Sequence, residues 1–108
     1  MSIELPQREQ SILQEAEHLI NGPRQEDYAH PYDDFTRIAK LWSAILGIEV
    51  PAERVPLMMV GVKISRECNK HKRDNLVDGA GYFGTLELLY AKKKQLEETN
   101  QLSKDLLL

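Results

Sequence analysis

Residues 63–78 read Lys-Ile-Ser-Arg-Glu-Cys-Asn-Lys-His-Lys-Arg-Asp-Asn-Leu-Val-Asp, and the rest of the chain is organised around this stretch. A mainly apolar segment enters it from Val55, and a segment of small residues leaves it through Gly79, Ala80 and Gly81. Both segments are expected to be helical, so the stretch contains the connection between two helices. It also concentrates basic side chains and two aspartates, which predicts the floor of a site for an anionic ligand.

Spacing within this stretch predicts two groups of side chains. Lys63, Arg66 and Lys70 are separated by three and four residues, so on a helix they share one face and can point at one anion. Asp74 and Asp78 are four apart and also share a face. Two such carboxylates can hold Mg²⁺, which prefers oxygen ligands and completes its shell with water and substrate phosphates. The alternative is structural: Asp74 caps a helix, Asp78 complements the helix dipole, and the bases form a solvated face.

Length and composition limit the class of protein. The 108 residues are enough for a single domain, and we expect one all-α domain over 1–108. Fourteen Lys and Arg against seventeen Asp and Glu give a formal charge of -3, which argues against nucleic acid as a partner and requires any positive patch to be local. A single cysteine excludes an intramolecular disulfide. No apolar run reaches the roughly 18 residues of a membrane helix, so we expect no membrane partner and a cytoplasmic location.

The first half of the chain predicts two helices and a loop. Apolar residues at helical spacing indicate an amphipathic helix over residues 7–20, ended by Asn21, Gly22 and Pro23. Residues 24–31 lack a period and are predicted to form a loop. A second helix is expected from Tyr32 or Asp33 to Leu46, and its core stripe is Phe35, Ile38, Trp42 and Ile45.

The second half predicts two further helices. One begins near Pro51 and is apolar on nearly all sides, which predicts the central helix of the fold, with a kink or a separate first turn at Pro56. The other runs from Asp74 to about Glu98, and its glycines at 79, 81 and 84 require close packing or a ligand. Residues 90–108 are expected to be either a protruding helix that pairs with another subunit or a frayed tail. The predicted class is all-α with about four helices.

Other polar residues admit two interpretations each. His30 before Pro31 can bond a ligand or stabilise a turn. Asp33 and Asp34 can each cap the second helix or bind an ion. Tyr82, beside the glycines, can stack on a ligand or pack between helices.

Several segments together resemble a family of small phage-encoded proteins of MazG-like, all-α nucleoside triphosphate pyrophosphohydrolase type. The segments are residues 12–17, 20–22, 27–31, 34–44, 57–59, 63–66 and 73–82. MazG enzymes bind Mg²⁺ through Glu-Glu-x-x-Glu on one helix and Glu-x-x-Asp on the next. Here the first pattern falls on residues 33–37, with Arg37 in the third acidic place. The second falls on residues 75–78, with Asn75 replacing Glu and Asp78 retained.

The resemblance implies a MazG-like helical bundle, completed as a homodimer or homotetramer, that hydrolyses a nucleoside triphosphate to the monophosphate and pyrophosphate with Mg²⁺ or Mn²⁺. The implied catalytic and metal-binding residues are Asp34, Asp74 and Asp78, and the implied nucleotide-binding residues are His30, Arg37, Lys63, Arg66, Lys70 and Tyr82. Because two of five acids depart from the pattern, a second hypothesis is a nucleotide-binding protein without turnover that sequesters an NTP, a dNTP or a nucleotide signal. A third is a helical structural or assembly protein. Convergence of the three aspartates on one ion would favour hydrolysis, and their separation would favour binding.

Overall fold

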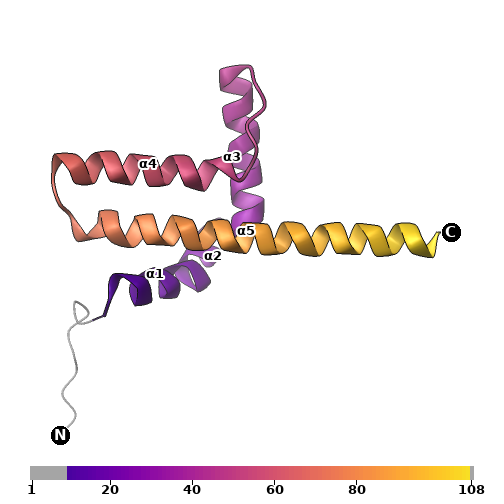
Figure 1. Cartoon of the computed structure of the whole chain (residues 1–108), viewed down its shortest axis with the longest axis horizontal. Helices are drawn as coiled ribbons and strands as arrows, with labels where there is room; N and C mark the ends of the chain where they lie inside the picture. The colour runs from indigo at the N-terminus through magenta and orange to yellow at the C-terminus, as the bar shows by residue number, and fades with distance from the viewer. Residues whose placement is uncertain (1–9, 108) are drawn as a thin grey trace, which may run out of the picture.

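A computed structural model describes residues 10–107 and contains five helices (Figure 1). They are α1 (Ile12–Asn21), α2 (Pro23–Tyr28), α3 (Pro31–Leu46), α4 (Arg54–Asn69) and α5 (Arg73–Leu106). The described residues contain no strand, so the all-α prediction is confirmed. The helix beyond the expected four is α2.

The prediction of a loop over residues 24–31 was wrong for most of that segment. α2 forms because Pro23, at the first helical position, fixes its backbone in a helical φ and has no N–H to leave unpaired. It ends at Ala29, whose φ is 68°. Gln25 Nε2 also donates to the carbonyl of Ile20 at 3.1 Å, tying α2 to the end of α1. α2 buries none of its six residues, which explains why its sequence has no apolar period.

Local capping sets where the first long helices begin. Ser11 and Gln14 form a capping box at the start of α1, so the described helix begins at Ile12, and residues 7–9 of the predicted helix lie outside the described part. α3 is capped by His30, whose Nδ1 accepts from the Tyr32 N–H at 3.0 Å. Neither Asp33 nor Asp34 is the cap. α3 ends at Gly47, which adopts the left-handed conformation with φ 72°.

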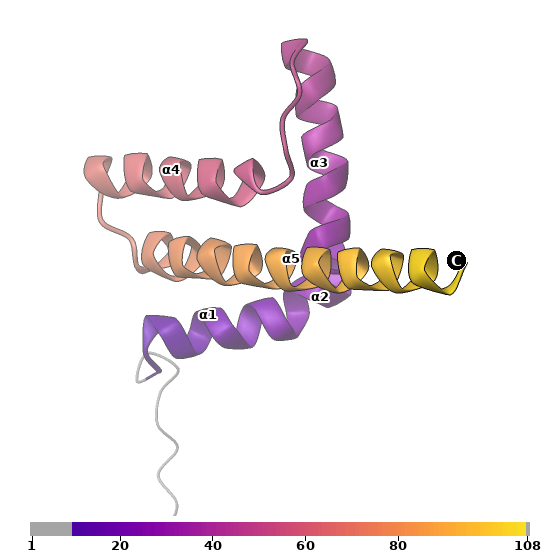
Figure 2. The ribbon, with the colours of Figure 1, turned by 45° about the vertical axis from the view of Figure 1, so that its right-hand side comes forward.

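The central helix is α5, which packs against α1, α3 and α4. Figures 1 and 2 show α1 and α4 on opposite sides of α5, with α3 crossing them. The prediction that the apolar segment now seen as α4 would be central was wrong, because within one chain α4 buries only Val55, Pro56 and Val60. Pro56 lies in the first turn of α4, where its missing N–H would have no helical partner, so its presence requires no kink.

The core lies where α3, α4 and α5 meet. Phe35, Ala39, Val55 and Leu89 are buried together, and Trp42 is among the partly buried residues packed on them. Ile45, predicted in the same stripe, is 76% exposed, because the C-terminal part of α3 extends beyond its neighbours (Figure 1). The apolar stripe of α3 is therefore used along only part of its length.

α1 and α5 approach closely at two glycines of α5. A Cβ added to Gly84 would lie 2.5 Å from Ile20 Cδ1, and one added to Gly81 would lie 3.6 Å from Ile20 Cγ2. Close packing, one of the two predicted reasons, therefore explains Gly84, whereas the contact at Gly81 is an ordinary van der Waals distance that alanine could adopt. A Cβ added to Gly79 would meet nothing within 4 Å, so packing within one chain does not explain that position.

The chain is extended and leaves much apolar surface uncovered. Its radius of gyration is 17.5 Å, against about 13 Å for a compact domain of this length. Among residues 10–107, fifteen large hydrophobic side chains are exposed. The C-terminal part of α5 continues beyond the other helices (Figure 2), which matches the protruding helix and not the frayed tail. None of the described helices has the length and hydropathy needed to cross a bilayer.

Candidate functional site

The stretch at residues 63–78 forms the walls of one hollow of about 540 Å³, which we call the basic hollow. It lies between the C-terminal half of α4 and the first turns of α5. Its lining is Lys63, Ser65, Arg66, Asn69, Lys70, Lys72, Asp74, Asn75 and Asp78. Four cationic and two anionic side chains therefore share this hollow in a chain whose overall charge is -3.

The charges in the basic hollow are only partly paired. Lys63 Nζ lies 2.8 Å from Asp78 Oδ2, and the Lys63 side chain is only 15% exposed, so this ion pair ties α4 to α5. Arg66 and Lys70 are exposed and form no ion pair with any residue between 10 and 107. Their charges are available to an anion from solvent.

Glu67 holds the turn that shapes one wall of the basic hollow. Its Oε1 accepts from the Lys72 N–H at 3.0 Å and from Asn75 Nδ2 at 3.1 Å, and its Oε2 lies 2.5 Å from His71 Nδ1. The bond from His71, followed by those from Asn75 and Lys72, holds the pKa of Glu67 below its ordinary value. Asn75, which stands where a MazG pattern has Glu, is buried and bound to this carboxylate. In this chain Asn75 therefore has a structural partner, the Glu67 carboxylate.

A second hollow of about 270 Å³, which we call the Arg24 pocket, lies among α1, α2 and α5. Its lining is Ala16, Leu19, Ile20, Pro23, Arg24, Asp27, Tyr28, Val77, Asp78, Gly81, Tyr82 and Thr85. The floor is mainly aliphatic, whereas the aromatic and charged groups come from α2 and from Asp78 and Tyr82 of α5. This is the composition of a small-molecule pocket: apolar surface with a few polar groups to orient a ligand.

The Arg24 guanidinium is held on several sides. It lies 5.2, 5.5 and 5.4 Å from the ring centroids of Tyr28, Phe35 and Tyr82, within the range of cation–π attraction. Arg24 Nη2 also lies 3.4 Å from Asp34 Oδ2. Because α2 places Arg24, Asp27 and Tyr28 at positions i, i+3 and i+4, one short helical turn supplies the polar wall of the pocket.

The two hollows adjoin at Asp78, which lines both. The basic hollow supplies the cations, and the Arg24 pocket supplies the aromatic and aliphatic surface. Neither hollow alone has both properties.

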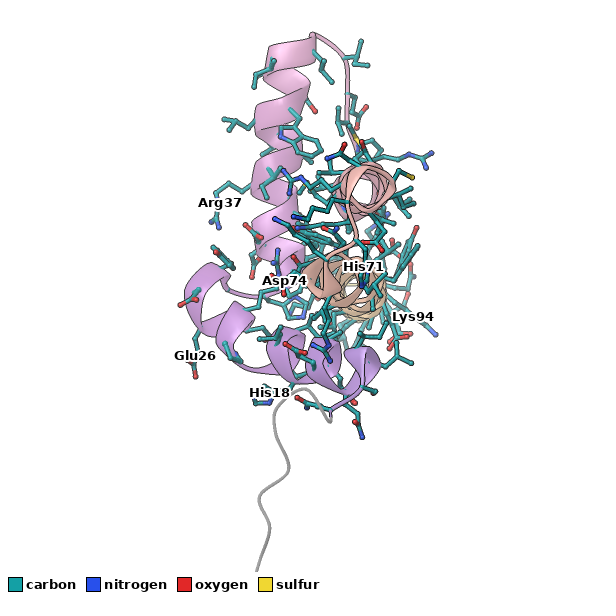
Figure 3. The ribbon with its side chains drawn as sticks, turned by 90° about the vertical axis from the view of Figure 1, so that its left-hand side faces the viewer. His18, Glu26, Arg37, His71, Asp74 and Lys94 are labelled. Carbon is teal, nitrogen blue, oxygen red and sulfur yellow. The ribbon has the colours of Figure 1, made fainter. Side chains whose placement is uncertain are left out.

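The structure brings together most, but not all, of the predicted site residues. Lys63, Arg66, Lys70, Asp74 and Asp78 all line the basic hollow, and Tyr82 lines the adjoining pocket. The remaining predicted residues, His30, Asp34 and Arg37, line neither hollow. Figure 3 shows Arg37 extending from α3 on the side away from α4 and α5.

The three aspartates predicted to hold a metal do not form one cluster. Asp34 is buried and ion-paired with Arg24 at 3.4 Å and with Arg37 at 3.7 Å. Between residues 10 and 107, no three His, Cys, Asp or Glu side chains are grouped so that they could hold a metal ion. The three-acid set therefore does not fit one ion in this arrangement, and Asp74 and Asp78 remain as a pair beside the cations.

The sequence prediction missed Arg24, Asp27, Tyr28 and Lys72, all of which line a hollow. Lys72 lies inside the stretch quoted first, but it belongs to the connection between helices, so helical spacing could not include it. Arg24, Asp27 and Tyr28 have i, i+3, i+4 spacing, which would have indicated a shared helical face. This spacing was not used because the segment was interpreted as a loop.

Fold and site together define an all-α protein that has a cationic hollow joined to an aromatic pocket. The chain belongs to the family described as DUF6378, a domain of unknown function, which matches residues 11–90. Its relatives include a protein called Gene 55 protein from Mycobacterium phage L5, 43% identical over 96 residues, which cover 87% of this chain and 58% of the relative. A second Gene 55 protein, from Mycobacterium phage D29, is 40% identical over 82 residues, which cover 75% of this chain and 54% of the relative. The chain thus spans between half and two thirds of the length of these curated relatives, and no solved structure matches it significantly.

Proposed function

We propose that this protein binds a nucleotide, with the phosphates in the basic hollow and the base in the Arg24 pocket. The observation that carries the proposal is the position of Asp78, which joins a hollow rich in cations to a pocket with aromatic walls. A nucleotide combines the same two properties in one molecule. Without turnover, binding amounts to sequestration of an NTP, a dNTP or a nucleotide signal.

The basic hollow suits phosphates in both charge and geometry. Arg66 and Lys70 lie one turn apart on α4 and its C-terminal cap, and both are exposed. Arg presents a planar fork to phosphate oxygens, and Lys adds a point charge. Because the chain as a whole has a negative net charge, the positive charge is local to the hollow and is not a property of the whole surface.

The Arg24 pocket suits a planar ring. Tyr28 and Tyr82 supply aromatic faces, and Leu19, Ile20 and Val77 supply aliphatic contacts. Stacking on such side chains contributes about 1–3 kcal/mol per base in proteins that bind nucleic-acid bases.

The proposal is tested by incubating the protein with a mixed nucleotide pool and Mg²⁺ and then identifying both what stays bound and what is converted. The bound nucleotide is next titrated calorimetrically into Arg66→Ala with Lys70→Ala. We expect affinity to fall at least tenfold because two phosphate contacts are lost, each of about 1 kcal/mol or more. The double variant Lys40→Ala with Lys94→Ala removes the same charge elsewhere and should bind normally. If both double variants bind the nucleotide with equal affinity, the phosphates do not bind in the basic hollow.

Mg²⁺-dependent hydrolysis to the monophosphate and pyrophosphate is a second candidate, favoured by one observation. Asp74 and Asp78 both line the hollow proposed for the phosphates. Two carboxylates together with substrate phosphates can hold Mg²⁺, which would neutralise charge on the phosphates. Within one chain Asp34 would take no part, because it is paired with Arg24 and Arg37.

Pyrophosphate release distinguishes the two candidates. If the protein is a hydrolase, wild type should release pyrophosphate only with Mg²⁺ or Mn²⁺, and Asp78→Ala should abolish release while its circular dichroism remains helical. Asp105→Ala, which removes an acid at the far end of α5, is the matched control. A wild-type protein inert towards every NTP and dNTP with either metal leaves binding alone.

We also propose that the protein is a homo-oligomer. α4 is apolar on most sides, as a helix surrounded by others would be, yet Met58, Val62 and Ile64 are exposed in one chain. Ile64 and Leu76 line one apolar groove between α4 and α5, and Phe83 and Tyr90 follow Leu76 at seven-residue intervals on α5. A second copy presenting the same face would cover both helices.

Light scattering at micromolar concentration tests this assembly. Phe83→Ser, which removes an aromatic ring 56% exposed, should shift the mass towards that of a monomer. Leu41→Ser, which removes a side chain 64% exposed on α3, should leave the mass of the assembly unchanged. A wild-type protein that scatters as a monomer contradicts the proposal.

A further inference from the structure

We infer that the Arg24 pocket selects bases that carry an exocyclic amino group, with Asp27 as the residue that reads it. Adenine, cytosine and guanine have such a group, and uracil and thymine do not. The inference rests on the proposed nucleotide binding and specifies the class of nucleotide.

Most polar groups of the pocket already have partners within the chain. Arg24 is engaged by Asp34 and by three aromatic rings. Asp78 pairs with Lys63. Thr85 Oγ1 donates to the carbonyl of Tyr82 at 2.8 Å. Few polar groups of the pocket are therefore free to bind a ligand and to discriminate between ligands.

Asp27 is the exception among the charged groups of the lining. It is exposed, it lines the pocket, and no hydrogen bond or ion pair within residues 10–107 engages its carboxylate. It lies on the same turn of α2 as Arg24 and Tyr28, next to the cation–π cluster where a ring would stack. The charged group that is available beside the base is therefore the Asp27 carboxylate, which is a hydrogen-bond acceptor.

An ionised carboxylate accepts hydrogen bonds and cannot donate them. An exocyclic amino group offers it two N–H donors, whereas the carbonyl that replaces this group in uracil brings two acceptors face to face. The N3–H of uracil is a donor, but it lies between two carbonyl oxygens that a carboxylate must also approach. The Asp27 carboxylate thus favours a base that carries an exocyclic amino group.

Two ligand pairs that exchange the exocyclic amino group for a carbonyl, and with it an adjacent ring-nitrogen acceptor for an N–H donor, test the inference: CTP with UTP, and ATP with ITP. We expect wild type to bind the amino-bearing member of each pair about tenfold more tightly, the effect of one hydrogen bond to a charged group. In Asp27→Asn the side chain offers both a donor and an acceptor, so the preference should fall to near unity. Asp33→Asn removes the same charge from a residue that lines neither hollow and should keep the wild-type preference.

The outcomes separate the inference from the proposed function. Wild type that binds CTP and UTP equally, or prefers UTP, overturns the inference and leaves nucleotide binding in place. A preference that survives in Asp27→Asn removes Asp27 as the reading residue. A protein that retains no nucleotide from the mixed pool refutes the proposed function, and the inference falls with it.

Discussion

The contact between Ile20 and Gly84 sets the distance between α1 and α5, and substitution of Gly84 measures it. In Gly84→Ala the new Cβ would lie 2.5 Å from Ile20 Cδ1, so the Ile20 side chain must move. Alanine favours a helix interior over glycine by about 1 kcal/mol. Because Ile20 Cδ1 is the end of a flexible side chain, its displacement should cost about 1 kcal/mol, the low end of overpacking, so the variant should have about the stability of wild type.

Ile20→Val supplies the matched background because it deletes the atom that the new Cβ would meet. Alone it should cost about 0.5–1 kcal/mol, the lower part of the usual range, because Ile20 is only partly buried. In this background Gly84→Ala should stabilise by about 1 kcal/mol. The double-mutant cycle therefore predicts a coupling of about 1 kcal/mol between the two positions.

Urea denaturation of the four proteins measures this coupling. All four must be compared at one protein concentration, since association would stabilise the folded state. If Gly84→Ala stabilises the protein equally in both backgrounds, α1 does not approach α5 at Ile20, and the wall of the Arg24 pocket that Ile20 forms is misplaced. Ligand affinity measured in the same four proteins would then be expected to stay constant.

Three further results follow from the packing. The pKa of the Glu67 carboxyl is lowered, so its contribution to stability is present above its ordinary pKa of about 4.5 and is lost as pH falls through the lowered pKa. Between about pH 5 and about pH 3, the melting temperature of Glu67→Gln should therefore fall less than that of wild type. If the two proteins have the same pH profile, the turn does not depend on this carboxylate. Leu89→Ala empties a site that is 0% exposed and should cost about 2–5 kcal/mol in chemical denaturation, whereas Leu102→Ala, at a side chain 60% exposed, should change stability by less than about 0.5 kcal/mol. Deleting residues 95–108 should leave the melting temperature and nucleotide affinity unchanged and remove only helical circular dichroism, because this end of α5 is almost wholly exposed; a large fall in melting temperature would show that the segment is packed, as it would be in an assembly.

The basic hollow could be predicted from sequence because its residues lie within one contiguous stretch. Helical spacing was enough to group Lys63, Arg66 and Lys70, and the turn that follows brings Asp74 and Asp78 to the same place. The all-α class followed in the same way, from local periodicity and caps. Such features depend on neighbours in the chain, which a sequence displays directly.

The Arg24 pocket could not be predicted, because its parts come from α1, α2 and α5. Asp34 shows the same limit: its position beside Arg24 depends on how α2 is set against α3, and no spacing within α3 reports this. For α4, the apolar pattern predicted a helix covered on nearly all sides, but only one side is covered in a single chain. Tertiary placement decides each of these cases.

The short helix α2 gives the site a modular construction. Three of the groups that would meet the base, Arg24, Asp27 and Tyr28, stand on a single turn that buries none of its own residues. Of the cations of the basic hollow, Lys63 and Arg66 stand on α4, which also contributes to the core, and Lys70 and Lys72 lie in the turn between α4 and α5. If the pocket binds a ring as proposed, substitution of the exposed Asp27 can change which ring is accepted while Arg24 keeps its contacts with Asp34 and Phe35 of the bundle, so relatives that share this fold can diverge in ligand.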